Sequence, residues 1–160
     1  MKIFWMVTFT CFLFVTSLTT KGYAQDTDKS LWKAQVKQFI EDRTDIANKL
    51  ESCEVYDKKI RDPFINIFID RDADSFIYIR IKGIIDDRCV YAEEFIGNMQ
   101  FECKYSEEQR KAVASYYRKL MKQYSKQLAK DGSVTLEYDA NNPMNIYMND
   151  GTCSISLVNK

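Results

Sequence analysis

Four cysteines constrain the fold of this chain more than any other feature of its sequence. They are Cys53, Cys89, Cys103 and Cys153, and a fifth, Cys11, lies in an apolar stretch near the N-terminus. The four are widely spaced and include no Cys-x-x-Cys pair, and the chain has no histidine to share a metal ion with them. An even number of cysteines in this pattern predicts two disulfide bonds rather than a metal site.

The N-terminal segment has the pattern of a cleaved secretory signal peptide. Lys2 supplies a positive charge, residues 3–18 are mainly apolar, and the small residues Gly22 and Ala24 stand at the −3 and −1 positions of a cleavage site. The apolar run is shorter than the roughly 20 residues that a membrane-spanning helix needs. We therefore expect cleavage after Ala24, which removes residues 1–24 together with the fifth cysteine.

The part that would remain, residues 25–160, has the length of a single domain. Cleavage removes Lys2 and Lys21 and no acidic residue, so the net charge of +0 becomes −2. No run of basic residues is available to neutralise phosphates, so nucleic acid is not an expected partner. The signal peptide and the disulfides together predict an exported protein, periplasmic or secreted, with no transmembrane segment after processing.

Two stretches have the periodicity of amphipathic helices. In residues 31–50 the apolar side chains form one stripe, and the charged side chains between them, Arg43 included, are expected to face solvent. A second helix is expected at residues 106–130. Ser106 and Gln109 have the spacing of a capping box at its start, and a glycine follows its end.

The remaining periodicity is that of short strands. Residues 76–85 are the strongest example, because isoleucines alternate along them with aromatic and charged side chains. Further strands are expected at residues 64–69, on both arms of a hairpin between Cys89 and Cys103, and at three places in the tail. Together with the two helices, this predicts an α+β domain with an antiparallel sheet of about seven short strands.

The central hairpin can form in two registers, which place opposite faces of its strands toward the core. A turn centred on Ile96 sets Cys89 opposite Cys103, whereas a tight turn at Gly97–Asn98 sets Cys103 opposite Ala92. We favour the first register because it brings two sulfur atoms to cross-strand distance.

The tail carries a second hairpin signal at Asp150–Gly151. A turn there pairs the residues before it with a strand that starts at Cys153, and it directs the Cys153 side chain inward. Four cysteines can pair in three ways. We favour Cys89–Cys103 together with Cys53–Cys153.

The sequence contains no recognisable catalytic motif. Without histidine there is no Ser-His-Asp or Cys-His arrangement, and the 5 glycines form no Gly-x-Gly-x-x-Gly or Walker motif that would bind a nucleotide cofactor. A pair of carboxylates, as in glycoside hydrolysis, is the remaining catalytic option. The candidates are the acidic residues in and before the central hairpin: Glu93, Glu94, Glu102, Asp86 and Asp87. Acidic residues on strands more often form the solvent face of a half-buried sheet.

The run Asp70-x-Asp72-x-Asp74 is similar to the start of a calcium-binding loop. The match then fails, because Ser75 stands where the loop needs glycine and Ile81 stands where it needs a bidentate glutamate. We therefore expect a turn here rather than a metal site.

Tyrosines are the candidate binding residues, because their side chains join a large apolar body to a polar tip. Tyr78, Tyr105 and Tyr147 are expected to be exposed. With no catalytic or cofactor motif, the leading interpretation is a small exported binding protein of the inhibitor or immunity kind, whose partner is another protein or an envelope macromolecule. The alternatives are a carboxylate-dependent hydrolase of glycans or the cell wall, and a carrier of a small ligand.

Overall fold

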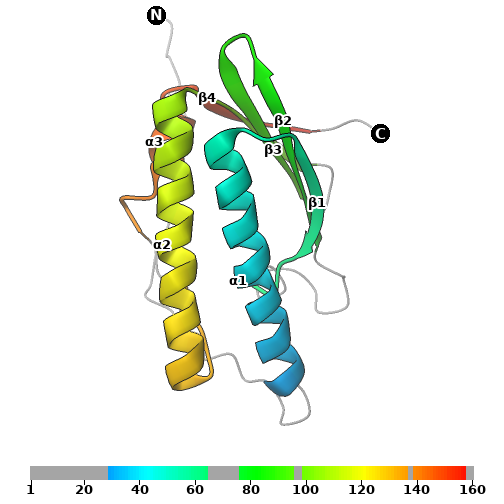
Figure 1. Ribbon diagram of the computed structural model, residues 1–160, viewed down its shortest axis with the longest axis vertical. Helices are drawn as coiled ribbons and strands as arrows, with labels where there is room; N and C mark the ends of the chain where they lie inside the picture. The colour runs from blue at the N-terminus through cyan, green and yellow to red at the C-terminus, as the bar shows by residue number, and fades with distance from the viewer. Residues whose placement is uncertain (1–28, 65–75, 96–98, 137–138, 158–160) are drawn as a thin grey trace, which may run out of the picture.

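The computed structural model describes residues 29–64, 76–95, 99–136 and 139–157. They form an α+β fold in which two long helices lie side by side on one face of a five-stranded antiparallel sheet (Figure 1). The elements, in chain order, are α1 (Lys29–Ser52), β1 (Tyr56–Arg61), β2 (Phe76–Ile85), β3 (Arg88–Phe95), β4 (Met99–Tyr105), α2 (Glu107–Asp131), α3 (Pro143–Asn149) and β5 (Cys153–Leu157). The expected signal peptide lies outside the described residues.

The sheet is a meander, in which each strand pairs antiparallel with the next one along the chain. β1 and β5 are therefore its two edges. Along β2 the expected alternation is confirmed, because Ile77, Ile79 and Ile81 are at most 1% exposed while Tyr78 and Arg80 between them are exposed. The buried isoleucines belong to the core that the sheet forms with the helices.

The second long helix begins and ends where its sequence predicts. The Ser106 hydroxyl accepts the backbone N–H of Gln109 at 3.2 Å, and the Gln109 side-chain oxygen accepts the backbone N–H of Ser106 at 2.9 Å. This completes the expected capping box. At the other end, Gly132 takes the left-handed conformation (φ 66°) and its N–H donates to the Leu128 carbonyl.

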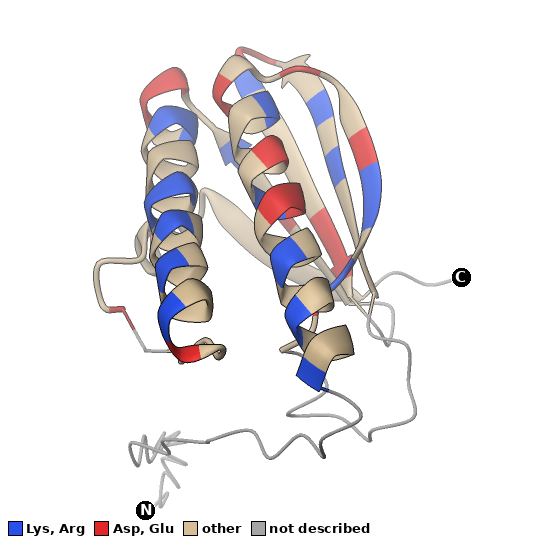
Figure 2. Cartoon of the chain, turned by 60° about the horizontal axis from the view of Figure 1, so that its bottom comes forward, with Lys and Arg blue, Asp and Glu red and all other residues tan. Residues whose placement is uncertain are grey.

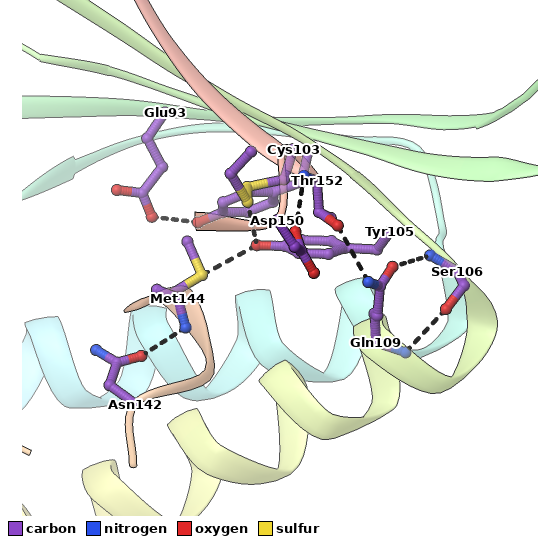
Figure 3. Close-up of a disulfide and its surroundings, with 11 residues drawn as sticks. Glu93, Cys103, Tyr105, Ser106, Gln109, Asn142, Met144, Asp150 and Thr152 are labelled. Carbon is purple, nitrogen blue, oxygen red and sulfur yellow. Dashed lines mark hydrogen bonds between the residues drawn. A yellow bond between two sulfur atoms is a disulfide. The ribbon is translucent and has the colours of Figure 1, made fainter. Parts of the chain in front are cut away.

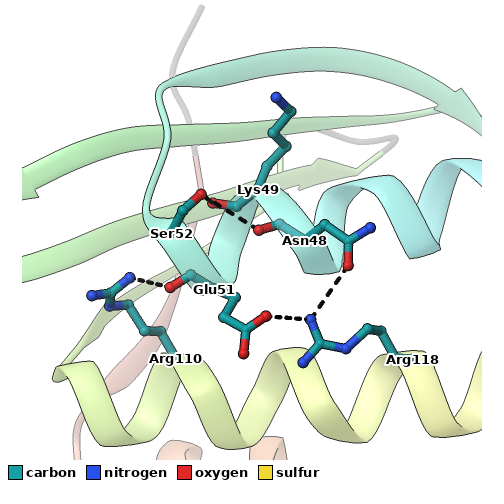
Figure 4. Close-up of polar contacts among 6 residues, drawn as sticks. All are labelled: Asn48, Lys49, Glu51, Ser52, Arg110 and Arg118. Atoms are coloured by element: carbon teal, nitrogen blue, oxygen red, sulfur yellow. Dashed lines mark hydrogen bonds and ion pairs between the residues drawn. The ribbon is translucent and has the colours of Figure 1, made fainter.

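Arginines of α2 hold the end of α1 in place (Figure 4). Arg118 Nη1 lies 2.5 Å from Glu51 Oε2 and 3.3 Å from Asn48 Oδ1. Arg110 donates to the backbone carbonyl of Glu51, one of the carbonyls that a helix leaves without an internal partner at its C-terminus. These bonds fix the end of α1 just before Cys53, which forms one of the disulfides.

The tail differs most from the prediction. Residues 143–149 form helix α3 rather than a strand, and residues 134–136 belong to no strand, so the described part of the sheet has five strands instead of about seven. Asn142 begins the helix, because its side-chain oxygen accepts the backbone N–H of Met144 at 3.0 Å. Pro143 occupies the first turn, where no backbone N–H is needed.

β1 is a strand that the alternation does not predict. Its sequence, Tyr-Asp-Lys-Lys-Ile-Arg, buries only Ile60. An edge strand can be this polar because little of its surface meets the core. Of the strand expected at residues 64–69, Phe64 lies in a turn, and the other residues lie outside the described part of the chain.

The predicted hairpin register and the predicted cysteine pairing are both wrong. Cys89 lies opposite Tyr105, which is a shift of two residues from the register that sets it opposite Cys103. The disulfides join Cys53 to Cys89 and Cys103 to Cys153. An even shift leaves each side chain on its expected face, so the cysteines are buried as predicted but meet different partners.

Candidate functional site

The two long helices cover one face of the sheet (Figure 1). We call the other face the open face, and the strand alternation directs polar and aromatic side chains to it. Cross-strand pairing aligns them in two rows, each of which crosses all five strands. The rows are Lys59, Tyr78, Glu94, Gln100, Ser156 and Asp57, Arg80, Ala92, Glu102, Ser154. The sheet thus presents a broad patterned surface built from every strand.

Ion pairs connect the charged side chains of the open face. Arg80 lies 3.1 Å from Asp57 and 3.9 Å from Glu94. Lys82 Nζ lies 2.6 Å from Glu102 Oε2, and since these residues belong to β2 and β4, the pair bridges over β3. The open face therefore carries charges of both signs in fixed relative positions.

A shallow depression lies at the centre of the open face, over the small side chain of Ala92. It is lined by Tyr78, Arg80, Lys82, Ala92, Glu94 and Gln100. A carrier of a small ligand would need a sizeable and mainly apolar cavity. This small depression gives the carrier alternative no specific support.

Of the three tyrosines expected to be exposed, only Tyr78 is, with 39% of its surface accessible on the open face. Tyr105 is fully buried, because it shares the inward side of β4 with Cys103. Tyr147 of α3 is half-buried, and its ring packs edge-on against that of Tyr105 at 5.7 Å. The prediction is wrong for Tyr105 because this residue lies on the inward side of its strand, and wrong for Tyr147 because the tail hairpin does not form.

Cationic and aromatic side chains meet beside Tyr78. Lys59 Nζ lies 3.9 Å from the centre of the Phe76 ring and 5.3 Å from that of Tyr78. Both distances are within the range of a cation–π interaction. Tyr78 therefore lies beside a cation and a second aromatic ring on the open face.

Glu93, one of the candidate catalytic acids, lies on the covered face of the sheet in a buried ion pair. Its Oε1 lies 2.5 Å from Arg43 Nη1, and the two side chains are 8% and 9% exposed. The Tyr91 hydroxyl donates to the same carboxylate oxygen. Arg43 also lies over the rings of Phe39 and Tyr117, with its guanidinium carbon 5.4 and 5.9 Å from the ring centres. The sequence places Arg43 on the solvent side of its helix, and that expectation is wrong.

The buried pair accounts for the direction of two pKa shifts. Burial lowers the pKa of Arg43, but the charge of Glu93 and the neighbouring tyrosines outweigh burial and raise it above the ordinary value. Burial, reinforced by the negative charge of Glu93, raises the pKa of Tyr91. Arg43 therefore stays charged and Tyr91 stays neutral near neutral pH, so both directions strengthen the pair as an anchor of the fold.

The candidate carboxylates do not converge on one cleft. Glu93 lies on the covered face, whereas Glu94 and Glu102 lie on the open face, each beside a basic side chain. Asp86 and Asp87 form the exposed turn between β2 and β3, where both have positive φ. Hydrolysis of a glycan needs two carboxyl groups facing each other across the substrate. This arrangement gives that alternative no specific support.

The described residues contain no group of three His, Cys, Asp or Glu side chains that could hold a metal ion. The run Asp70-x-Asp72-x-Asp74 lies outside them. None of the described helices combines the length and the apolar character needed to cross a membrane.

The edge strand β5 is attached to the rest of the fold at its beginning (Figure 3). The Cys103–Cys153 disulfide joins it to β4, and Gln109 Nε2 donates to the Thr152 hydroxyl at 3.1 Å. Thr152 N–H donates in turn to Asp150 at 2.8 Å. Beyond this attachment, the strand continues through side chains that are exposed.

Basic residues, drawn in blue in Figure 2, recur along α2. Lys122 and Lys126 are exposed there, on the side of the helix opposite to the buried Met121 and Tyr124. A charged outer side is the ordinary condition of a helix that packs one stripe on a sheet. The stretch of α2 around Lys122 and Lys126 is therefore an ordinary solvated helix face.

No protein-family model, curated protein or solved structure matches this chain. Its function is therefore inferred from the geometry of its surfaces.

Proposed function

We propose that this protein is a small exported binding protein, stabilised by two disulfides, that holds another protein against the open face of its sheet. The observation that carries the proposal is the side-chain array on that face, where Tyr78 and Arg80 are exposed beside charged groups of both signs. Tyrosine and arginine are among the residues most enriched where binding energy concentrates at protein interfaces.

The charge pattern favours a protein as the partner. Arg80 and Lys82 alternate with Glu94 and Glu102 over a short distance, so the open face has no single sign of charge. A polyanion would meet carboxylates there, whereas a protein surface with its own mixture of charges can complement both signs. Complementary charges of this kind set the specificity and the orientation of a complex.

Rigidity is the second supporting property. The open face is part of a hydrogen-bonded sheet, and the disulfides Cys53–Cys89 and Cys103–Cys153 tie its third and fourth strands to α1 and β5. A surface ordered in advance loses little conformational entropy when it binds. The function would then depend on the presentation of side chains, with no chemical step.

Affinity capture tests the proposal. The full chain would be expressed into an oxidising compartment, purified with both disulfides formed, immobilised, and exposed to native exported and envelope proteins. We expect one stoichiometric partner. The double variant Tyr78→Ala, Arg80→Ala should bind it about 30-fold more weakly, the effect of losing about 2 kcal/mol at an interface hot spot.

Lys126→Ala on the outer side of α2 is the matched control and should bind the partner like the wild type. The proposal would be contradicted by capture of no partner, or by a partner that the Tyr78, Arg80 double variant binds with unchanged affinity.

Export is tested separately, by N-terminal sequencing of the protein recovered from the same expression. The proposal predicts that the chain starts at Gln25. A recovered chain that still begins at Met1 would contradict cleavage of the N-terminal segment.

A further inference from the structure

The outer side of β5 offers backbone hydrogen-bonding groups to another strand. β5 is the last strand in the order of the sheet, and Lys104 N–H donates to the Thr152 carbonyl at 3.0 Å. In an antiparallel ladder, every second residue bonds to the same neighbour. Cys103 and Cys153, the next pair along the ladder, therefore do not hydrogen-bond to each other through their backbones, in agreement with their Cα–Cα distance of 4.1 Å. The N–H and C=O groups of Cys153, Ile155 and Leu157 are therefore directed away from β4.

Apolar side chains accompany this open backbone. On the covered face of the sheet, Leu157 pairs with Met99 and Ile155 pairs with Phe101. The exposed fractions are 76% for Leu157, 56% for Ile155 and 40% for Met99, so the helices leave this end of the face uncovered. We call these four residues the β5 strip. Contiguous exposed apolar side chains on a soluble protein commonly mark an interaction site.

The charges on the two edge strands decide which edges of two copies can pair. β5 has the sequence Cys-Ser-Ile-Ser-Leu and carries no charged residue, whereas β1 carries Asp57, Lys58, Lys59 and Arg61. Two β1 strands paired antiparallel about Lys58 or about Lys59 would set that lysine opposite the same lysine of the other copy. Pairing of β1 with β5 of another copy leaves an unused edge at each end and continues into a fibre. Of these three pairings, only that of β5 with β5 avoids facing like charges and also stops at two copies.

A two-fold axis beside Ile155 gives a self-complementary register. Ile155 then faces Ile155 of the second copy, and Cys153 faces Leu157, so every residue with outward backbone groups meets another of the same kind. These pairs exchange both of their backbone hydrogen bonds. On the opposite side of the sheet, Ser154 meets Ser156, and each side chain stays on the face that matches its polarity.

Helix α3 supplies apolar cover for this pairing. α3 packs against β5, with the Met144 sulfur 3.0 Å from the Tyr105 hydroxyl beside the Cys103–Cys153 disulfide (Figure 3). The same helix leaves Ile146 57% and Met148 36% exposed. In the register above, Leu157 of the second copy lies next to Cys153, on the face where α3 packs. Met148 stands one turn after Met144 on the same side of α3, so it is the exposed apolar side chain available to cover it.

We infer that β5 is a dimerisation strand, through which two copies of this chain join their sheets antiparallel about Ile155 into one continuous sheet. The inference does not rest on the proposed function. Ser154 and Ser156 lie on the open face, so the dimer joins the open faces of both copies side by side and leaves Tyr78 accessible. A failed capture experiment and a failed dimerisation experiment are therefore separate results.

Molecular mass in solution tests the inference. Light scattering of the oxidised full chain should give twice the mass of one copy at micromolar concentration. Ile155→Glu should raise the dimer dissociation constant at least about 100-fold, because two like charges would face each other across the axis. An equimolar mixture of Ile155→Glu and Ile155→Lys should recover a dimer that contains one copy of each variant, since opposite charges then meet.

Ile84→Glu is the matched control. Ile84 lies in β2, three strands away from β5, and is 57% exposed, so this variant should remain dimeric. Circular dichroism and the thermal midpoint should show that both glutamate variants fold, since both positions are exposed in the single copy. A wild-type monomer at 100 micromolar, an open-ended assembly, or a dimer that persists in Ile155→Glu would each overturn the inference.

Discussion

β1 and β5 are the two edges of one sheet, yet β1 is held by charged and hydroxyl groups and β5 by sulfur and apolar contacts. Lys58 of β1 lies 2.8 Å from the buried Asp42, and the Tyr56 hydroxyl donates to Asp45 at 2.7 Å. The Arg43–Glu93 pair lies between the two edges, where α1 meets the central strand β3. β5 is held instead by the Cys103–Cys153 disulfide and by α3.

The difference shows how a meander can protect one edge and leave the other available. Charged side chains on an edge strand discourage pairing with another chain, because pairing would bring like charges together and desolvate them. β1 has such side chains, and β5 has none. A disulfide attaches β5 firmly to the sheet without occupying the outer side of its backbone, so the strand can be stable and still available for pairing.

The largest expected effect is between the two edges, at the Arg43–Glu93 pair that joins α1 to the central strand β3. Glu93→Gln leaves Arg43 buried without its counter-ion and should lower the free energy of unfolding by about 3–5 kcal/mol. Glu94→Gln, the next residue but on the open face, should change it by less than about 1 kcal/mol. Urea unfolding of both variants gives the comparison. A loss below about 1 kcal/mol for Glu93→Gln would show that the ion pair does not anchor α1 to the sheet.

Removing each disulfide in turn should distinguish an effect on the free energy of unfolding from an effect on dimerisation. Each closes a long loop, with sequence separations of 36 and 50 residues, so replacing either pair by alanine should cost about 2–4 kcal/mol. Only Cys103→Ala with Cys153→Ala should also weaken the dimer, because only that pair secures β5. Equal weakening by Cys53→Ala with Cys89→Ala would remove the distinction between the edges.

Two buried hydroxyl groups provide a finer comparison. The Tyr91 hydroxyl donates to the Glu93 carboxylate, whereas the Tyr105 hydroxyl has the Met144 sulfur as its partner. At pH 7, Tyr91→Phe should cost about 1.5–3 kcal/mol, the value of a hydrogen bond to a charged group. Tyr105→Phe should cost less than about 1 kcal/mol, because a thioether is a weak acceptor.

Alkaline pH should reverse the effect of the Tyr105 substitution. Burial is the main cause that raises the pKa of Tyr105 above the ordinary tyrosine value of 10.0. A raised pKa means that stability is complete below pH 10 and is lost as the pH rises through the folded-state value. Tyr105→Phe removes the group, so it should become more stable than the wild type above pH 10 in urea unfolding. A constant difference between the two proteins from pH 7 to 12 would contradict this account.

Periodicity predicted the elements in which side-chain burial alternates strongly. The isoleucines of residues 76–85 and the capping box at Ser106 identify β2 and α2 because each depends on interactions within the element itself. β1 could not be found in the same way, since an edge strand with Ile60 as its one buried residue has almost no apolar pattern.

Pairing between elements was harder to predict. Met144, Ile146 and Met148 alternate like a strand, but the same spacing allows a helix, and Asn142-Pro143 begins one. The exposure of Tyr147 was predicted from the tail hairpin, so that prediction is wrong as well. The cysteine pairing depends on the register and on which strands are neighbours, and neither follows from the spacing of cysteines.

Of the candidate binding residues, Tyr78 was found because it alternates with buried isoleucines, whereas Arg43 and the β5 strip were missed. Arg43 is buried only because Glu93 lies opposite it on another element, which no local pattern reveals. The exposure of Ile155 and Leu157 likewise depends on where the helices end above the sheet.

Amide hydrogen exchange at two protein concentrations tests the difference between the edges most directly. The account predicts that, between about 1 and 100 micromolar, exchange slows at the outward amides of Ile155 and Leu157 in β5 and stays the same throughout β1, because only β5 amides gain partners in the dimer. Exchange in β5 that does not depend on concentration, or equal slowing in both edge strands, would contradict it.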